Sequence, residues 1–204
     1  MPHDMSVETP AAATRTLKNI AIFCGSNTGL GDAFKDAAAQ LGATLARRGI
    51  GIVYGGTHKG LMGILANAAL AEGGHVHGVI TRRLFERDHL HPTLSLHEIV
   101  EGMRARKERM LTLADACIAL PGGIGTTEEF MEAWTLNQLG DIDKPVGLLN
   151  VGGYFDAFMA FVDTMIAQRF LPPEHRAGIA LAPDADGLID QLQVFRKPTV
   201  AKWL

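Results

Sequence analysis

Residues 121–130, PGGIGTTEEF, place a glycine-rich turn directly before two adjacent carboxylates. Glycines in this spacing are typical of a turn whose backbone amides hold a phosphate at the start of a helix. Residues 122–126 therefore predict a phosphate site, unless they form a structural turn only. Glu128 and Glu129 would then fall in the first turn of the helix, where a carboxylate repels a bound phosphate. Their presence suggests chemistry beside the phosphate.

The glycine spacing excludes two common kinds of nucleotide site. A dinucleotide site requires G-x-G-x-x-G after the first strand, but that turn reads CGSNTG. Residues 123–128 read GIGTTE, so Glu128 replaces the third glycine and would disturb close packing of the helix on its strand. The P-loop signature of nucleoside triphosphatases is also absent from the sequence.

One arginine falls on the apolar side of a helix expected at residues 103–115. At about 3.6 residues per turn, Arg106 lies between Met110 and Leu113, on the face that should pack against a sheet. A buried guanidinium needs an anionic partner, which here is either Glu129 or a ligand phosphate. Lys107 borders the same face and either joins the site or extends into solvent.

The two glutamates differ in the direction that they should take. Glu129 precedes Ala133 by four residues and Leu136 by seven, so it leans toward the packed surface as they do. An inward carboxylate beside a phosphate site is unfavourable, which favours a catalytic role for Glu129. Glu128 either belongs to the site or merely stabilises the helix N-terminus, by about 0.3–1 kcal/mol.

Short apolar runs alternate with helical ones along the chain. Strands are expected at residues 19–26, 49–56, 75–80, 96–100, 116–123, 145–151 and 178–182, and helices at 32–48, 61–74, 103–115, 126–140, 154–170 and near the end. Residues 81–95 read as a long polar loop. The alternation predicts an α/β, Rossmann-like three-layer sandwich with a mostly parallel sheet of about seven strands. Its carboxyl edge would gather the glycines of residues 24–26, 54–63 and 121–126, where such folds bind ligands.

The composition agrees with one globular domain. Of the 204 residues 47% are hydrophobic, and we expect a disordered tail at residues 1–18 before a single domain at 19–204. A net charge of −3 and a pI near 6.2 lack the basic excess of nucleic-acid-binding proteins, and no apolar run is long enough to cross a membrane. Cys24 and Cys117 lie in apolar runs, which favours buried thiols in a reducing cytoplasm over a disulfide.

The histidines give only a weak signal for metal binding. His75 and His77 alternate along one expected strand, and His89 and His91 alternate in the loop. No third ligand stands at a convincing distance from either pair, so we expect no metal site.

These segments together resemble one enzyme family. FCGSN, VYGGTHKGLMG, MRARKERM, PGGIGTTEEFMEAW and KPVGLLNVGGYFDAFMAF are similar to the LONELY GUY family of cytokinin-activating enzymes, over nearly the whole chain from Asn19. The resemblance implies a Rossmann-like homodimer with active sites near the subunit interface. It also implies hydrolysis of the N-glycosidic bond of an N6-substituted AMP, a nucleoside 5′-monophosphate, to free base and ribose 5-phosphate, without a metal or other cofactor.

The resemblance also implies the residues of the site. Arg106 and Glu129 match the catalytic pair of the family. The matching substrate-binding positions are Gly25, Ser26, Gly56, Asp88, Lys107, Gly122, Gly123, Ile124, Gly125, Thr126, Thr127, Glu128 and Thr135.

Three positions depart from the family pattern. Asp88 replaces a glutamate, Arg104 replaces a histidine, and Thr57 interrupts a run of three glycines. The changes at Arg104 and Thr57 would alter base preference more than chemistry. The label "lysine decarboxylase" that such sequences once carried has no support, since no lysine stands in a context typical of pyridoxal phosphate binding.

Glycosidic bond hydrolysis gives the carboxylates a role beside a phosphate. Positive charge develops on the ribose in the transition state, so Glu129 would attract the transition state more than the neutral sugar. The phosphate would anchor the sugar, while Arg106 screens the two anions from each other. Two alternatives remain open: a broader nucleosidase that cleaves plain AMP nearly as well, and a nucleotide- or cofactor-binding carrier without turnover.

Overall fold

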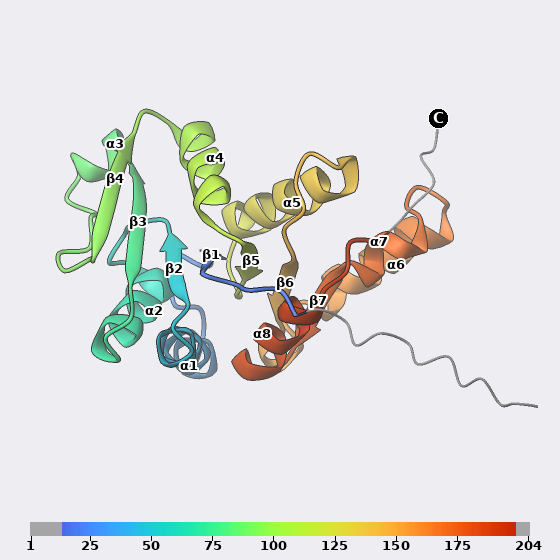
Figure 1. Cartoon of the computed structure of the whole chain (residues 1–204), viewed down its shortest axis with the longest axis horizontal. Coiled ribbons are helices and arrows are strands. Elements are labelled where there is room, and N and C mark those ends of the chain that lie inside the picture. The colour runs from blue at the N-terminus through green and yellow to red at the C-terminus, as the bar shows by residue number, and fades with distance from the viewer. Residues whose placement is uncertain (1–13, 199–204) are drawn as a thin grey trace, which may run out of the picture.

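The computed structural model describes residues 14–198, which contain a single seven-stranded sheet with helices on both faces (Figure 1). The strands are β1 (Asn19–Phe23), β2 (Gly51–Tyr54), β3 (Val76–Thr81), β4 (Leu96–Val100), β5 (Ala116–Ala119), β6 (Val146–Leu149) and β7 (Ile179–Ala182). The helices are α1 (Ala33–Arg47), α2 (Gly60–Ala71), α3 (Arg82–Phe85), α4 (Met103–Leu113), α5 (Ile124–Leu139), the 3₁₀ helix η1 (Val151–Gly153), α6 (Asp156–Ala167), α7 (Pro173–Ala177) and α8 (Ala185–Val194). None of these helices is both long and apolar enough to span a membrane.

The sheet is parallel throughout, and its strands follow the order β4-β3-β2-β1-β5-β6-β7. This confirms the predicted Rossmann-like α/β sandwich of about seven strands. From β1 the chain adds β2, β3 and β4 in order on one side of the sheet. It then crosses back and adds β5, β6 and β7 on the other side of β1. Ligands of such sheets bind where the order reverses, at the carboxyl ends of β1 and β5. There the Gly25 amide donates to the Pro121 carbonyl at 3.1 Å, which brings two of the glycine clusters together.

Alternate residues of the central strands enter two separate apolar cores. Ile20 and Ile22 of β1 pack with α1, α2 and α8, whereas Ala21 and Phe23 pack with α4, α5 and α6. Successive side chains of a strand point to opposite faces, so each strand is buried on both sides. The two helical layers lie on opposite sides of the sheet in Figure 1.

Helices α1 and α2 pack closely because Gly42 of α1 has no side chain. A Cβ at this position would lie 2.3 Å from the Leu65 carbonyl oxygen of α2, well inside van der Waals contact. The missing side chain at Gly42 thus sets the spacing between α1 and α2. At the start of α2 the Leu61 amide donates to the Gly25 carbonyl at 3.0 Å, which joins this helix to the loop after β1.

Three local features differ from the sequence predictions. The expected loop 81–95 contains the short helix α3, whose Thr81 side chain accepts from the Leu84 amide and so begins the helix. The expected tail is ordered from residue 14, because Arg15 pairs with Asp143 at 2.8 Å and Leu17 is buried; residues 1–13 lie outside the described residues. Helix α7 was not expected. The proposed single-domain boundary at residue 19 stays a prediction.

Gly42→Ala tests the close contact between α1 and α2. Alanine favours a helix by about 1 kcal/mol over glycine, yet the collision with Leu65 should outweigh this gain, and we expect a net loss of about 1–3 kcal/mol in the free energy of unfolding. Urea denaturation measures the change. Gln40→Ala, on the exposed face of the same helix, should stay within about 0.5 kcal/mol of wild type. A Gly42→Ala protein as stable as wild type would contradict the packing argument.

Candidate functional site

A cavity of about 550 Å³ opens at the carboxyl edge of the sheet, where the sequence placed the site. Three segments form most of its wall: the loop after β1, the β2–α2 connection and the N-terminus of α5. Its lining residues are Cys24, Gly25, Ser26, Asn27, Thr57, Lys59, Met62, Leu84, His89, Arg106, Gly123, Ile124, Gly125 and Thr126. Seven of the predicted catalytic and substrate-binding residues therefore line one cavity: Gly25, Ser26, Arg106, Gly123, Ile124, Gly125 and Thr126.

Arg106 extends from α4 into this cavity and is buried, as its place on the apolar face predicted. Its Nε donates to the Val79 carbonyl at 2.9 Å, and its Nη1 lies 3.3 Å from Glu129 Oε1. Glycine is required at position 55 beside it, since a Cβ there would lie 1.7 Å from Arg106 Nη2. Of the two anionic partners that the sequence allows for Arg106, Glu129 and a ligand phosphate, Glu129 pairs with it in the structure.

Glu129 is a carboxylate held in a poorly solvated position. Only 11% of its side chain is exposed, and burial raises its pKa above the ordinary value for glutamate. Arg106 opposes this shift and favours the ionised form, whereas the negative charges of Glu128 and Glu132 add to it. A buried carboxylate with a single close cation is electrostatically primed to stabilise a positive charge that develops nearby.

The N-terminus of α5 leaves room for an anion. The helix begins at Ile124, with Gly123 as its extended N-cap, and no side chain caps the first amides. No heavy atom beyond the neighbouring residues lies within 4 Å of the position that a Cβ would take at Gly123 or Gly125. Free amides and an open approach suit a phosphate at this turn.

The early start of α5 also corrects the expected position of the two acids. The helix begins two residues before the predicted Thr126, so its first turn contains no acidic residue. Glu128 and Glu129 follow in the next turn. The carboxylates are therefore set back from the open amides, which lessens the repulsion that the sequence alone implies.

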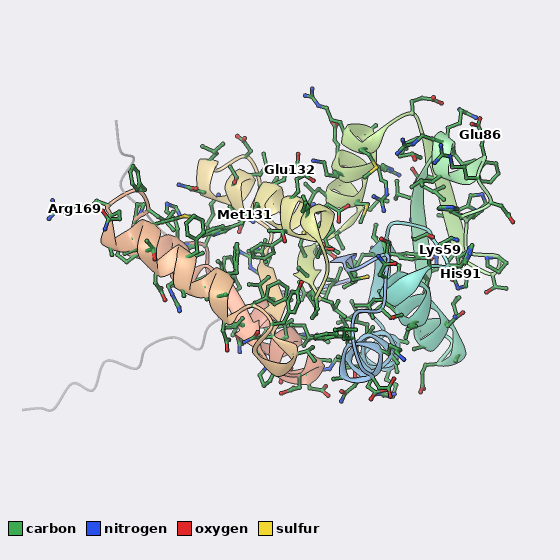
Figure 2. The ribbon with its side chains drawn as sticks, turned by 180° about the vertical axis from the view of Figure 1, so that it is seen from behind. Lys59, Glu86, His91, Met131, Glu132 and Arg169 are labelled. Atoms are coloured by element: carbon green, nitrogen blue, oxygen red, sulfur yellow. The ribbon has the colours of Figure 1, made fainter. Side chains whose placement is uncertain are left out.

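Lys107 is bound to α5 and does not extend freely into solvent. Its Nζ contacts Glu128 and lies 3.2 Å from Glu132 Oε2, and only 12% of the side chain is exposed. Glu132 projects from α5 in Figure 2. Lys107 thus neutralises Glu128 as Arg106 neutralises Glu129, and the two pairs join α4 to α5.

The other predicted residues take places around the cavity without lining it. Gly122 lines a neighbouring cavity of about 240 Å³, and its carbonyl accepts from the Tyr154 hydroxyl at 2.6 Å. Gly56 follows β2 with a φ of 74° and its carbonyl accepts from the His91 amide. Asp88 and Thr135 are exposed, and Thr135 lies in the second half of α5. Thr127 is exposed as well, with its hydroxyl bonded to the Gly123 carbonyl.

Sequence reasoning missed several residues of the wall. Lys59, at the start of α2, and His89, in the loop after α3, both line the cavity. Lys59 and His91 lie in the same region beside α2 in Figure 2. Lys59 lies within the glycine cluster of residues 54–63, which follows β2. This position after a strand end is the sequence signal that indicates a place at the site. The alternation of His89 and His91 in the sequence gives no direction toward the cavity, because contacts of the loop place His89 there.

The histidines and cysteines of the described residues form neither a metal site nor a disulfide. Within residues 14–198, no three His, Cys, Asp or Glu side chains converge in a way that could hold a metal ion. His77 Nε2 lies 3.1 Å from Glu98 but is not aligned for a hydrogen bond, and His91 pairs with Asn67 at 3.0 Å. Cys24 and Cys117 are free and buried, which confirms the expectation of thiols, and burial raises the pKa of both.

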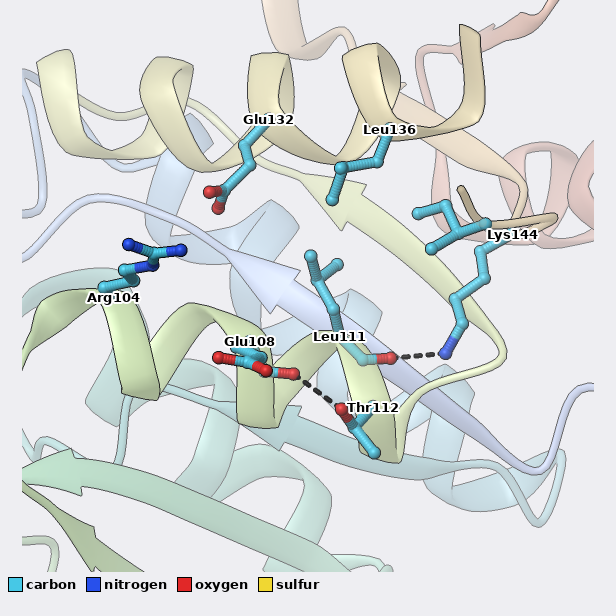
Figure 3. A pocket seen from close by; sticks show the side chains of 8 residues that line it. Arg104, Glu108, Leu111, Thr112, Glu132, Leu136 and Lys144 are labelled. Atoms are coloured by element: carbon cyan, nitrogen blue, oxygen red, sulfur yellow. Dashed lines mark hydrogen bonds between the residues drawn. The ribbon is translucent and has the colours of Figure 1, made fainter. Parts of the chain in front are cut away.

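A second cavity of about 380 Å³ lies between α4 and α5, away from the glycine turn (Figure 3). Glu132 and Leu136 extend from α5 toward Arg104, Glu108 and Leu111 of α4 (Figure 3). At its far end the Lys144 ammonium donates to the Leu111 and Ala114 carbonyls and so satisfies the C-terminus of α4. This groove holds none of the residues that surround the glycine turn, and it is lined partly by apolar side chains.

Several named proteins are similar to this chain in sequence. The profile of a family described as "possible lysine decarboxylase" matches residues 62–192. A probable cytokinin riboside 5′-monophosphate phosphoribohydrolase of Oryza sativa subsp. japonica is 42% identical over 200 residues, which cover 94% of this chain and 88% of the relative. A cytokinin riboside 5′-monophosphate phosphoribohydrolase of Arabidopsis thaliana is 44% identical over 178 residues, or 87% of this chain and 84% of the relative. The chain belongs to the LONELY GUY family.

Solved structures show that the fold of this LONELY GUY protein is shared more widely. A molybdenum cofactor binding protein of Rippkaea orientalis matches with a TM-score of 0.64 at 21% identity, over 84% of this chain and 92% of the other. A Moco carrier protein of Chlamydomonas reinhardtii matches with a TM-score of 0.65 at 21% identity, with the same coverage of 84% and 92%. At this identity the likeness is one of fold alone.

Arg106→Met tests the buried ion pair of this family member. The substitution leaves Glu129 without its close cation, and we expect the free energy of unfolding to fall by about 3–5 kcal/mol at pH 8. Because burial then raises the pKa of Glu129 unopposed, the folded state binds a proton more tightly than the unfolded state. The stability deficit relative to wild type should therefore shrink as the pH falls and Glu129 becomes protonated.

Urea denaturation at pH 8 and pH 5 measures this dependence. Arg83→Met, at an exposed position of α3, provides the control and should change stability little at either pH. A deficit for Arg106→Met that is equal at both pH values would show that Glu129 does not depend on Arg106 for its charge.

Proposed function

We propose that this protein hydrolyses the N-glycosidic bond of a cytokinin riboside 5′-monophosphate, releasing the free base and ribose 5-phosphate. One observation carries the proposal: Arg106, paired with the buried Glu129, lines the same cavity as the open N-terminus of α5. The names of relatives more than 40% identical over most of the chain support the same activity.

The phosphate of the substrate binds at the start of α5. Amides of residues 123–126 and the helix dipole attract it, and its binding energy positions the ribose above the Arg106–Glu129 pair. The phosphate is an anchor that does not react. A substrate without it would therefore lose turnover as well as affinity.

Glu129 stabilises the transition state. As the bond between the ribose and the base lengthens, positive charge develops on the sugar, and the carboxylate attracts this charge more than it attracts the neutral ground state. Glu129 also orients the attacking water or holds the ribose hydroxyls. Arg106 lines the cavity and lies between its partner Glu129 and the proposed phosphate, so it screens the two anions from each other.

A carrier function fits the residues less well. The Moco carrier proteins share the fold at 21% identity, and a binding site for a phosphorylated ligand requires the open helix N-terminus only. An inward carboxylate with its own buried arginine is unfavourable for binding an anion and useful for cleaving a glycosidic bond. The retained pair therefore favours the enzyme.

Glu129→Gln tests the proposed hydrolysis. Release of base and ribose 5-phosphate from N6-isopentenyl-AMP and from AMP is measured for wild type and variant. Loss of the negative charge should lower kcat by about 10²–10³-fold, the range found for removal of one preorganised electrostatic group, while nucleotide affinity persists. Glu174→Gln, the same exchange on the exposed surface of α7, should leave kcat unchanged.

The two substrates separate the alternatives. Preference for the prenylated nucleotide supports the cytokinin-directed enzyme, and equal rates would indicate the broader nucleosidase. A wild-type protein that binds both nucleotides but cleaves neither would leave only the carrier.

We further propose that the protein acts as a homodimer through the α4–α5 face. The groove between these helices contains Leu111, Leu136 and Ile142, and Ile124 and Leu139 of α5 are 89% and 63% exposed. Thr135, which the family resemblance places at the nucleotide, is exposed on α5 and does not line the cavity of its own chain. This suits a residue that serves a neighbouring subunit. The two free thiols suit a cytoplasmic enzyme.

Leu136→Arg tests the dimer. A charge on the α4–α5 face should convert the protein to a monomer in analytical ultracentrifugation. Phe161→Arg, which replaces an exposed aromatic residue of α6, provides the matched control and should leave the assembly unchanged. A wild-type monomer, or a dimer disrupted only by Phe161→Arg, would contradict the proposed interface.

A further inference from the structure

The proposed hydrolysis needs a proton donor that the Arg106–Glu129 pair does not supply. When the bond between C1′ and the base breaks, the electron pair stays on the base, which leaves readily only if a ring nitrogen gains a proton. Arg106 is unsuited because arginine stays protonated, with an ordinary pKa of about 12.5 or higher. Its Nε and Nη1 are also bound to Val79 and Glu129.

The walls of the cavity show where the base must lie. In the proposed function the start of α5 holds the phosphate, and the Arg106–Glu129 pair lies beside the ribose. The loop after β1 adjoins the start of α5, since the Gly25 amide donates to the Pro121 carbonyl. The base is therefore left with the β2–α2 connection, the first turn of α2, α3 and the loop after α3. Met62 and Leu84 provide apolar surface for a planar base, and His89 provides an imidazole on the same side.

His89 is fixed by backbone contacts although it belongs to a loop. Its amide donates to the Leu84 carbonyl at 3.1 Å, and its carbonyl accepts from the His58 amide at 3.1 Å. The neighbouring residue Leu90 forms an antiparallel bridge with Thr57, and the His91 amide donates to the Gly56 carbonyl at 2.9 Å. The His89 backbone is thus joined to α3 through its amide and to the β2–α2 connection through its carbonyl and the two residues that follow, and its side chain lines the cavity.

We infer that His89 is the catalytic acid of the proposed hydrolysis and protonates the departing base. As the bond between C1′ and the base breaks, its electron pair moves to the base, and the His89 imidazolium gives its proton to a ring nitrogen. Water forms the new bond to C1′ and releases a proton to Glu129. Solvent then reprotonates His89 and takes the proton from Glu129, so both groups return to their starting states.

The other titratable side chains of the cavity are less suited to this step. Burial raises the pKa of the Cys24 thiol, which makes it a weak acid. Lys59 is a strongly hydrated cation at the start of α2, and lysine ordinarily holds its proton to a pKa of about 10.4. Histidine is the side chain whose ordinary pKa, about 6.5, best matches donation near neutral pH.

The test compares two leaving groups on the same ribose 5-phosphate. AMP or its N6-isopentenyl derivative carries a base that must be protonated, whereas 4-nitrophenyl ribose 5-phosphate releases a stable nitrophenolate without a proton. Turnover of both is measured for wild type, His89→Gln, Lys59→Gln and His58→Gln. His58 faces the His89 ring at 6.5 Å between centroids but does not line the cavity, so it is the matched control.

His89→Gln should lower kcat for the nucleotides by about 10²–10³-fold and keep nitrophenyl cleavage within about threefold of wild type. Retained nitrophenyl cleavage also shows that the variant is folded. His58→Gln should cleave both substrates at the wild-type rate.

Other outcomes overturn the inference in distinguishable ways. If His89→Gln slows both substrates equally, or neither, His89 is not the acid, although the hydrolase activity stands. A selective loss in Lys59→Gln would assign the step to Lys59. A wild-type protein that cleaves neither substrate would overturn the proposed function and this inference together.

Discussion

The burial of one ion pair constrains much of the surrounding structure. Arg106 and Glu129 come from different helices, and each would be strongly disfavoured inside the protein without the other. The pair therefore requires α4 and α5 to lie side by side over the sheet. It also requires a glycine at position 55, where any side chain would occupy the place of the guanidinium, and a β3 carbonyl at Val79 to accept from Nε. Gly55, β3, α4 and α5 together hold this pair in one arrangement before any substrate binds, which is the arrangement that the proposed reaction requires.

Two further charges show how a phosphate and carboxylates share one region. Glu128 binds Lys107 and Glu129 binds Arg106, so each acid has its own cation on α4. The first turn of α5 contains no acid and keeps its amides open. In the proposed reaction, the group that attracts the phosphate and the group that stabilises a cationic sugar are thereby separated by one helical turn. The fold itself does not dictate this division, since the same architecture occurs in Moco carrier proteins at 21% identity.

The loop after α3 completes the cavity on the side away from α5. The bridge between Thr57 and Leu90 joins this loop to the β2–α2 connection, and His89 of the loop lines the cavity together with Leu84 of α3. Thr57 interrupts the run of glycines that the family resemblance leads one to expect. The backbone contacts of the loop are made with Thr57 and with the residues on either side of it. Under the proposed function, variation in these two connections would change the walls around the base and leave Arg106, Glu129 and the start of α5 unchanged.

The sequence by itself determined the layered α/β fold, the glycine edge and the inward direction of Arg106 and Glu129. Those features depend on local periodicity and on the rule that parallel strands end at one edge, both of which can be read along the chain. Tertiary structure alone decided that Arg106 pairs with Glu129, that α5 begins at Ile124, and that His89 and Lys59 reach the cavity. These outcomes depend on contacts between segments distant in sequence, such as the one between Gly55 and Arg106. No local pattern encodes such contacts, because they arise only when the helices and loops are packed against the sheet.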